Sequence, residues 1–249
     1  MLKLFRRQVR YLRTPLSLTG FTLILLFGLV AAAAPWLAPP LVNKNAYEIP
    51  KDFAIGSPFP QPPNWSAWQT FPPDWHSHPL GTTGSDQYDL YYGVIWGTRT
   101  AFTVASVIVG FSMLIGIILG CLSGYFGGLL DNFIMRVVDI LLALPFLVLI
   151  VVLSVLLGSF PSINLFGFHW NIPRLWIVVV AITLANWTTY ARLVRGDLLS
   201  EKEKDYVLAV RSIGAGDVRI IIKHLLPNTI PSVLIYASLD FGKIGRAHV

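Results

Sequence analysis

Long stretches without charged residues are the feature that most constrains the fold of this chain. No residue that is ionised at neutral pH lies within residues 14–43, 100–130, 140–173 or 175–191, which are gaps of 30, 31, 34 and 17 residues. A bilayer-spanning helix needs about 17–25 largely apolar residues. Only 13% of the 249 residues are charged, against about 25% in a typical soluble domain. The sequence therefore predicts a polytopic, all-α membrane helix bundle.

Four complete spans and a partial fifth are expected from the apolar runs. The complete ones cover residues 16–37, 100–125, 137–160 and 175–191. Pro145 lies inside the third and is expected to kink it, because proline removes one backbone hydrogen bond. The fifth run starts near Thr229, and only 16 residues separate Lys223 from Asp240. It is therefore expected to be incomplete.

The first apolar run has two interpretations, because a basic segment, residues 1–15, precedes it and four consecutive alanines lie within it. A secretory signal would have an apolar core of about 7–15 residues. This run is about 22 residues long, which exceeds that core. An uncleaved first transmembrane helix over residues 16–37 is therefore preferred.

Residues 38–98 form a predicted extracytoplasmic loop rich in proline and aromatic residues. Ten prolines lie between Pro39 and Pro79, a density that stops regular helices and central strands. Trp65, Trp68 and other aromatic residues of the loop fit either a ligand-stacking platform or a position at the lipid headgroups. The second is favoured, because aromatic belts flank most membrane spans.

Lysine and arginine are distributed unequally between the two sides of the expected membrane. With residues 1–15 placed in the cytoplasm, the inner segments hold 13 of these residues and the outer segments hold 4. The positive-inside rule then places the N-terminus and residues 192–228 in the cytoplasm. The net charge of +6 suits the anionic inner leaflet and does not require a nucleic acid as partner.

No catalytic, phosphate-binding or metal-binding pattern is apparent in the sequence. Cys121 is the single cysteine, and no Gly-Lys-Ser or Gly-Lys-Thr of a phosphate-binding loop occurs. His76 and His78 have the spacing of metal ligands, but no Cys, Asp or Glu partner converges on them in the sequence. We therefore expect a chain without enzymatic activity, bound cofactor or metal.

Small and charged residues near the expected spans suggest packing and surface roles. Gly116 and Gly120 are four residues apart and, with Gly110, offer a small-residue face for packing within the subunit or against another membrane subunit. Asp131 and Arg136 border the inner surface, where an interfacial position and a contact with a cytoplasmic partner are equally supported.

The last polar segment carries the clearest functional pattern. Asp205 is expected to cap a helix over residues 206–213, and Gly214 to end it. Asp217 is expected to begin a second helix that Pro227 stops. Apolar residues of this knob are expected to be exposed and to suit a groove on a partner protein. They are Val207, Val210 and Ile213.

The same segment resembles the signature loop of permease subunits of binding-protein-dependent ATP-binding-cassette (ABC) importers. The pattern is Ala209, Gly214, nine intervening residues and then His-Leu-Leu-Pro at residues 224–227. The family's loop begins with Glu-Ala-Ala, and Leu208 stands where that glutamate would be, a departure common in the peptide-importing branch. Three stretches also agree with the dipeptide, oligopeptide and nickel branch: residues 78–99, 124–147 and 205–228.

The resemblance, from His78 to Gly242, implies a type I ABC importer transmembrane domain over residues 99–242, multi-pass in a prokaryotic inner membrane. It implies a translocation path for peptides or a similar small solute, with ATP and Mg²⁺ bound by other subunits. The implied partners are a paired homologous permease, two cytoplasmic ATPase subunits, an extracytoplasmic solute-binding protein and membrane lipid. Substrate-binding residues are not indicated. The implied ATPase-coupling residues are Asp205, Tyr206, Ala209, Arg211, Ser212, Gly214, Ala215 and Pro227.

The C-terminal segment departs from the family, whose members continue to a sixth span. Residues 243–249 read KIGRAHV, which the start of a widely used sequencing adapter also encodes, so a non-native tail on a C-terminally truncated gene is expected. Two other functions stay open: an ion-gradient-driven transporter or channel, and a membrane scaffold. A gradient-driven transporter would place acidic residues or broken helices near mid-membrane. The four complete spans contain one acidic residue, Asp139, which borders the inner surface at the start of the third.

Overall fold

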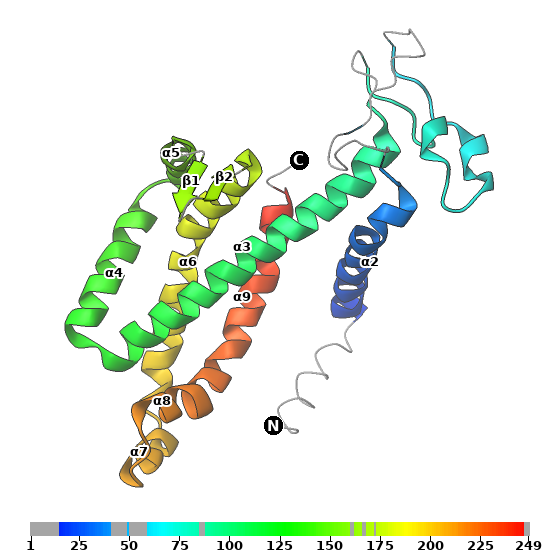
Figure 1. Cartoon of the computed structure of the whole chain (residues 1–249). Helices are drawn as coiled ribbons and strands as arrows, with labels where there is room; N and C mark the ends of the chain where they lie inside the picture. The colour runs from blue at the N-terminus through cyan, green and yellow to red at the C-terminus, as the bar shows by residue number, and fades with distance from the viewer. Residues whose placement is uncertain are drawn as a thin grey trace. The chain divides into compact units, whose positions relative to one another are not determined.

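The computed structural model describes residues 15–40, 49, 59–84, 88–159, 162–165, 168–171 and 173–246. The chain divides into two compact units, residues 1–103 and residues 104–249, and the elements are mostly helical (Figure 1). Of the predicted basic segment, residues 1–15, the first 14 lie outside the described residues. The long helices and the strands are α2 (Pro15–Leu37), α3 (Leu90–Phe126), α4 (Gly128–Ala143), α5 (Phe146–Gly158), β1 (Ser162–Leu165), β2 (Phe168–Asn171), α6 (Arg174–Glu201) and α9 (Leu226–Arg246).

The first unit holds α2, two short 3₁₀ helices and the beginning of α3. The 3₁₀ helices are η2 (Trp65–Gln69) and η3 (Trp75–Ser77). Two aromatic side chains of α3 bond the chain where α2 ends: the Tyr91 hydroxyl donates to the Leu37 carbonyl at 3.2 Å, and Trp96 Nε1 donates to the Ala38 carbonyl at 2.9 Å. These bonds satisfy carbonyls that the end of α2 leaves without intrahelical partners.

Helix α3 begins ten residues before the predicted Thr100, so the loop prediction for residues 90–98 was wrong. Asp89 explains the early start, because its Oδ1 accepts from the Tyr92 N–H at 2.6 Å and caps the helix. The other oxygen, Oδ2, lies 2.7 Å from His78 Nδ1. Helix α2, by contrast, matches the predicted span over residues 16–37.

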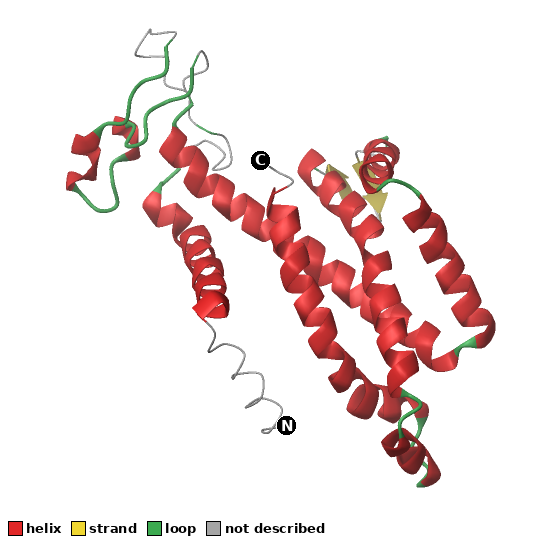
Figure 2. Ribbon diagram, turned by 180° about the vertical axis from the view of Figure 1, so that it is seen from behind, coloured by secondary structure: helices red, strands yellow, loops and turns green. Residues whose placement is uncertain are grey.

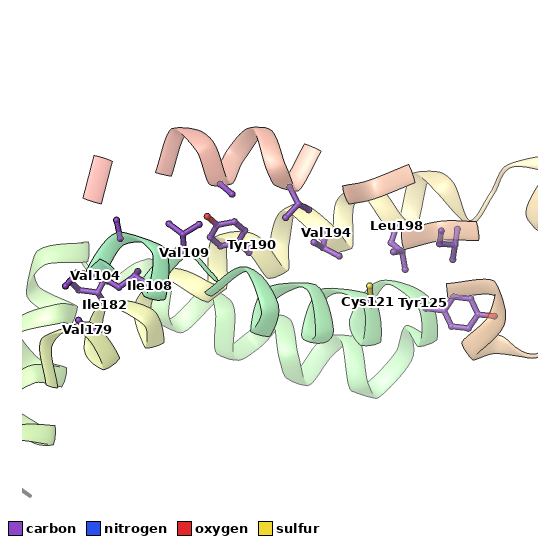
Figure 3. Close-up of a cluster of buried hydrophobic side chains, with 14 of the residues drawn as sticks. Val104, Ile108, Val109, Cys121, Tyr125, Val179, Ile182, Tyr190, Val194 and Leu198 are labelled. Carbon is purple, nitrogen blue, oxygen red and sulfur yellow. The ribbon is translucent and has the colours of Figure 1, made fainter. Parts of the chain in front are cut away.

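The second unit is built around α6, which packs against α4, α5 and α9. Figures 1 and 2 show α4, α6 and α9 side by side, with two short helices, α7 (Asp205–Ser212) and α8 (Asp217–Ile220), at one end. The core is a cluster of buried side chains from α3, α6 and the segments that follow, including Ile108, Val194, Leu198 and Val233. Figure 3 shows Tyr190, Val194 and Leu198 of α6 within it.

Three glycines of α3 let its backbone approach α6. A Cβ added to Gly116 would lie 2.3 Å from the Tyr190 Cβ, and one added to Gly120 would lie 2.7 Å from the Ala191 carbonyl oxygen. A Cβ on Gly124 would lie 3.1 Å from the Leu198 Cβ. The predicted small-residue face is confirmed as packing within the chain for Gly116 and Gly120, and we call these three positions the glycine seam. Gly110 does not belong to it, because a Cβ there would meet nothing within 4 Å.

The predicted third span is two helices, α4 and α5, bent by 102° at the break between them. The sequence predicted only a kink at Pro145, whereas the structure has a sharp break between two helices there. Leu144 has extended backbone angles, φ −86° and ψ 141°, and Pro145 precedes the first residue of α5. The residue before a proline is sterically driven out of the helical region, so α4 ends there and α5 starts in a new direction.

A small hairpin follows α5 where only a polar break was expected. Strands β1 and β2 pair antiparallel, with Ser162 opposite Asn171 and Leu165 opposite Phe168. Within the described ranges this hairpin is the one departure from the all-α prediction.

Three helices in the described part of the chain are long and apolar enough to cross a membrane: α3, α6 and the segment Asp217–Lys243. The α4–α5 pair would be a fourth if its two bent halves form one span. Thr22–Leu37 of α2 is a shorter apolar helix. The helix that contains the predicted fifth run starts well before Thr229 and passes through it.

Candidate functional site

Helix α7 has the length and the ending that the sequence predicts. It covers Asp205–Ser212, and its N-cap is Lys204, not the predicted Asp205. Asp205 instead lies in the first turn, where a negative charge favours the helix dipole. Gly214 has a φ of +81°, which glycine adopts without strain. Its N–H donates to the Arg211 carbonyl at 3.0 Å, and the Ala215 N–H donates to the Val210 carbonyl at 3.3 Å, so the helix is closed as a glycine C-cap requires.

The two faces of α7 have opposite environments. Val207 is only 1% exposed and Val210 packs against the core cluster that contains Val207. Leu208 is 52% exposed and Ile213 is 84% exposed. The predicted exposure of Val207 and Val210 was therefore wrong, whereas that of Ile213 is confirmed. We call Leu208, Ala209, Ser212 and Ile213, all exposed, the outer stripe of α7.

Pro227 does not stop the helix that follows, which corrects the second boundary prediction for this segment. Helix α8 passes into a single π-helical turn, Ile221–Leu225, and then directly into α9. The Leu226 N–H bonds to the Ile221 carbonyl across that wider turn. Pro227 lies directly after this wider turn, in the first turn of α9. Proline has no N–H to donate, and a π-helical turn is one of the local adjustments by which a helix accommodates it.

One group of hydrogen bonds joins the loop to the end of α3. The Tyr125 hydroxyl donates to Asp217 Oδ1 at 2.5 Å, and Arg211 Nη2 donates to the Tyr125 hydroxyl oxygen at 3.3 Å. The Arg211 guanidinium also lies 5.9 Å from the centroid of the Tyr125 ring, within the range of a cation–π contact. We call these three residues the Tyr125 anchor.

A second group joins the loop to α6 and α9. The Tyr206 hydroxyl donates to Glu201 Oε2 at 2.8 Å and accepts from Asn228 Nδ2 at 3.0 Å. Glu201 also pairs with Lys204. Burial and the bond to Glu201 raise the pKa of Tyr206, and the bond to Glu201 raises the pKa of Lys204. We call these residues the Glu201 anchor.

Polar contacts also fix α4 against α6 at the same end of the bundle. Arg195 Nε and Nη2 donate to the two carboxylate oxygens of Asp131 at 2.6 and 2.7 Å, and the Ser123 hydroxyl also donates to Asp131. Lys202 Nζ donates to the Gly124 carbonyl at 3.0 Å. The Asp131 carboxylate thus has partners within the chain, whereas Arg136 is exposed.

The predicted site residues therefore divide between two roles. Ala209 is exposed on the outer stripe, and Ser212, also on it, bonds the Leu208 carbonyl of its own helix at 2.9 Å. Tyr206 and Arg211 belong to the two anchors, and Ala215 packs against the core cluster. Tyr125, Glu201 and Asn228 also belong to the anchors, and the sequence did not indicate them as site residues. Tyr125 lies 92 residues from its partner Asp217, so no local pattern pairs them.

Residues 116–247 match the family model described as binding-protein-dependent transport system inner membrane component. The matched range contains the glycine seam, both anchors and all of α7. The chain belongs to this family. As a family member with several apolar helices, it is a multi-pass inner-membrane component. The predicted non-native tail, residues 243–249, stays a prediction.

Curated relatives of the chain are permease proteins of peptide transport systems. It is 30% identical over 230 residues to a dipeptide transport system permease protein of Bacillus subtilis, covering 92% of this chain and 61% of the relative. It is 31% identical to a probable D,D-dipeptide transport system permease protein of Escherichia coli, covering 92% and 65%. An oligopeptide transport system permease protein of Bacillus subtilis is 28% identical, covering 93% and 65%. The chain thus spans less than two thirds of the length of these three relatives.

Proposed function

We propose that the chain is a permease subunit of an ATP-driven importer and forms part of a translocation path for dipeptides, oligopeptides or a similar small solute. The family description supports a transport role that depends on a binding protein. The names of the three relatives, which refer to dipeptides, D,D-dipeptides and oligopeptides, support peptides as the substrate class. The chain itself has no enzymatic role in this proposal.

The single observation that carries the proposal is the outer stripe of α7. Its two large apolar residues, Leu208 and Ile213, are exposed at the end of the bundle. A cluster of this kind on a short, rigidly capped helix fits a groove on another protein. The proposed partner is a cytoplasmic ATPase subunit. The excess of Lys and Arg supports a cytoplasmic position for this end of the chain, and the family resemblance implies ATPase subunits there.

The complete assembly contains this chain, a paired homologous permease, two ATPase subunits and an extracytoplasmic solute-binding protein. ATP and Mg²⁺ belong to the ATPase subunits. Because Val207 on the opposite face of α7 is packed in the core, the helix would move together with the bundle when the ATPases close. This arrangement converts ATP-driven closure of the partners into a rearrangement of the membrane helices.

Asp240 favours a second candidate, transport driven by an ion gradient. It lies in the apolar segment Asp217–Lys243 and is only 5% exposed. Its Oδ2 accepts from Asn186 Nδ2 at 2.5 Å and from the Tyr190 hydroxyl at 3.0 Å. A carboxylate within a membrane segment is typical of ion-coupled transport, although these bonds also pack α6 against α9.

Reconstituted complexes in liposomes test both candidates. The complex would be assembled with the ATPase subunits and the binding protein of the importer, and peptide uptake would be followed with internal ATP or with an imposed pH gradient. The primary proposal predicts uptake that requires ATP and persists when an ionophore collapses the gradient. Uptake that follows the gradient without ATP would instead establish the second candidate.

The docking surface is tested by Ile213→Glu, with Ile213→Val as the matched control. A buried carboxylate at the contact would weaken ATPase binding by at least about tenfold, since an unpaired charge is costly to desolvate. The valine variant retains an apolar side chain and should bind the ATPases as the unmodified chain does. Equal ATPase co-purification by both variants would remove the docking assignment.

A further inference from the structure

Tyr125 lies where the membrane helices meet the proposed coupling loop. It is the penultimate residue of α3, and its ring, 9% exposed, packs in the same cluster as Val207 and Ile220 of the loop. Its hydroxyl reaches out of that cluster to two charged side chains. The residue therefore has an apolar part fixed in the core and a polar part bonded to the loop.

The two partners of the Tyr125 hydroxyl lie on opposite sides of a glycine link. Arg211 belongs to α7, Asp217 begins α8, and Gly214 and Gly216 lie between them. A Cβ added to either glycine would meet nothing within 4 Å, so within the link only Ala215, between the two glycines, packs against the core cluster. Through its hydroxyl, Tyr125 connects both sides of the link to one point on α3.

Helix α3 is itself fixed to α6 just before Tyr125. The glycine seam brings Gly116, Gly120 and Gly124 against α6, and Lys202 Nζ bonds the Gly124 carbonyl. The loop is joined to α6 through the chain itself, because only residues 202–204 separate α6 from α7. Helices α7 and α8 are hydrogen-bonded to α3 through Tyr125.

We propose that Tyr125 is a positioning residue that makes α7, α8 and the end of α3 move as one body when an ATPase is docked on α7. This inference rests on the proposed function. The hydroxyl acts as donor to Asp217 and as acceptor from Arg211, so phenylalanine would remove both bonds and keep the ring. In such a variant, the docked α7 moves about the glycine link without displacing α3.

The test compares the reconstituted complex with Tyr125→Phe and with Tyr91→Phe as the matched control. Tyr91→Phe also removes a hydroxyl bond, the one to the Leu37 carbonyl in residues 1–103. The readouts are peptide uptake per ATP hydrolysed and the amount of ATPase that co-purifies. Tyr125→Phe should keep ATPase binding and lower uptake per ATP by about two- to thirtyfold, the range in which single residues alter coupling. Tyr91→Phe should leave both unchanged.

A second variant, Asp217→Ala, removes the Tyr125–Asp217 bond from its other side and leaves Tyr125 unchanged. It therefore separates loss of the bond from a folding defect caused by changing Tyr125. Asp217 is exposed, so its removal should not disturb the core, and it should lower uptake per ATP in the same direction. The double variant should fall no further than Tyr125→Phe alone, because both changes remove one interaction.

Three outcomes would overturn the inference. Normal uptake per ATP in Tyr125→Phe would show that the hydroxyl does not transmit movement from the coupling loop to α3. A loss of uptake that parallels a loss of ATPase binding would show that Tyr125 only supports the shape of α7. Absence of ATP-driven uptake or of ATPase binding in the unmodified complex would remove the proposed function itself, and with it this inference.

Discussion

The glycine seam and the coupling loop are neighbouring regions of the second unit that are held together by different forces. At the seam, backbone and Cβ atoms of α3 and α6 meet so closely that Gly116 has no room for a methyl group. At the loop, residues 202–228, charged and hydroxyl side chains of the two anchors add hydrogen bonds to the apolar packing of Val207. Contact through backbones gives rigidity, because it has no rotamers to change, whereas side-chain hydrogen bonds fix positions that a partner protein can still shift.

The largest effect is expected from enlarging the seam. Gly116→Leu would place a Cβ 2.3 Å from the Tyr190 Cβ, so α3 and α6 would have to separate, at a cost of at least about 3 kcal/mol. The yield of monodisperse protein in detergent and its thermal unfolding would measure this. Gly110→Leu is the control, because a Cβ at Gly110 meets nothing within 4 Å. Equal yields for the two variants would show that the seam is not tightly packed.

A smaller effect is expected from the ion pair between α4 and α6. Asp131→Ala would leave the partly buried Arg195 without its two charged hydrogen bonds, at a cost of about 1–3 kcal/mol. The control is Asp139→Ala, because the side chains of Asp139 and its partner Arg192 are 64% and 53% exposed. That pair is worth about 0–1 kcal/mol. Thermal unfolding of both variants in detergent measures the difference, and equal shifts would contradict the assigned burial.

The C-cap of α7 should give an effect of about 1–2 kcal/mol. Gly214→Ala forces an L-residue to a φ of +81°, which costs about that amount. Gly216→Ala is the control, because Gly216 has a φ of −70°. Gly214→Pro should be more severe, since proline cannot reach that φ and lacks the N–H that bonds Arg211. We expect Gly214→Pro to uncouple ATP hydrolysis from uptake while the chain stays in the membrane, and normal uptake would contradict this.

The smallest effect on stability is expected on the outer stripe. Ile213→Ser should change the free energy of unfolding by less than about 0.5 kcal/mol, because the side chain is 84% exposed. Val207→Ser, on the inner face of the same helix, should cost about 2 kcal/mol because Val207 is 1% exposed. Similar unfolding temperatures for the two variants would mean that α7 does not have one packed and one free face.

Local patterns predicted much of this arrangement. The apolar runs identified α2, α3 and α6 because their length and composition are properties of contiguous residues. The end of α7 at Gly214 followed from the backbone freedom of glycine, and the four-residue spacing of Gly116 and Gly120 indicated a packing face. The limits of α3 were missed because Asp89, the cap that extends it, stands within a loop whose prolines suggested irregular structure.

The sequence by itself determined which segments are apolar, where α7 ends and where small residues lie on α3. The tertiary structure decided which face of α7 is free, that α4 and α5 point in different directions, and that the helix continues through Pro227. It also decided that Tyr125 joins Asp217, a residue 92 positions away. The physical reason is the same in each case: apolarity and backbone preference belong to neighbouring residues, whereas burial and hydrogen-bond partners depend on which distant segments meet.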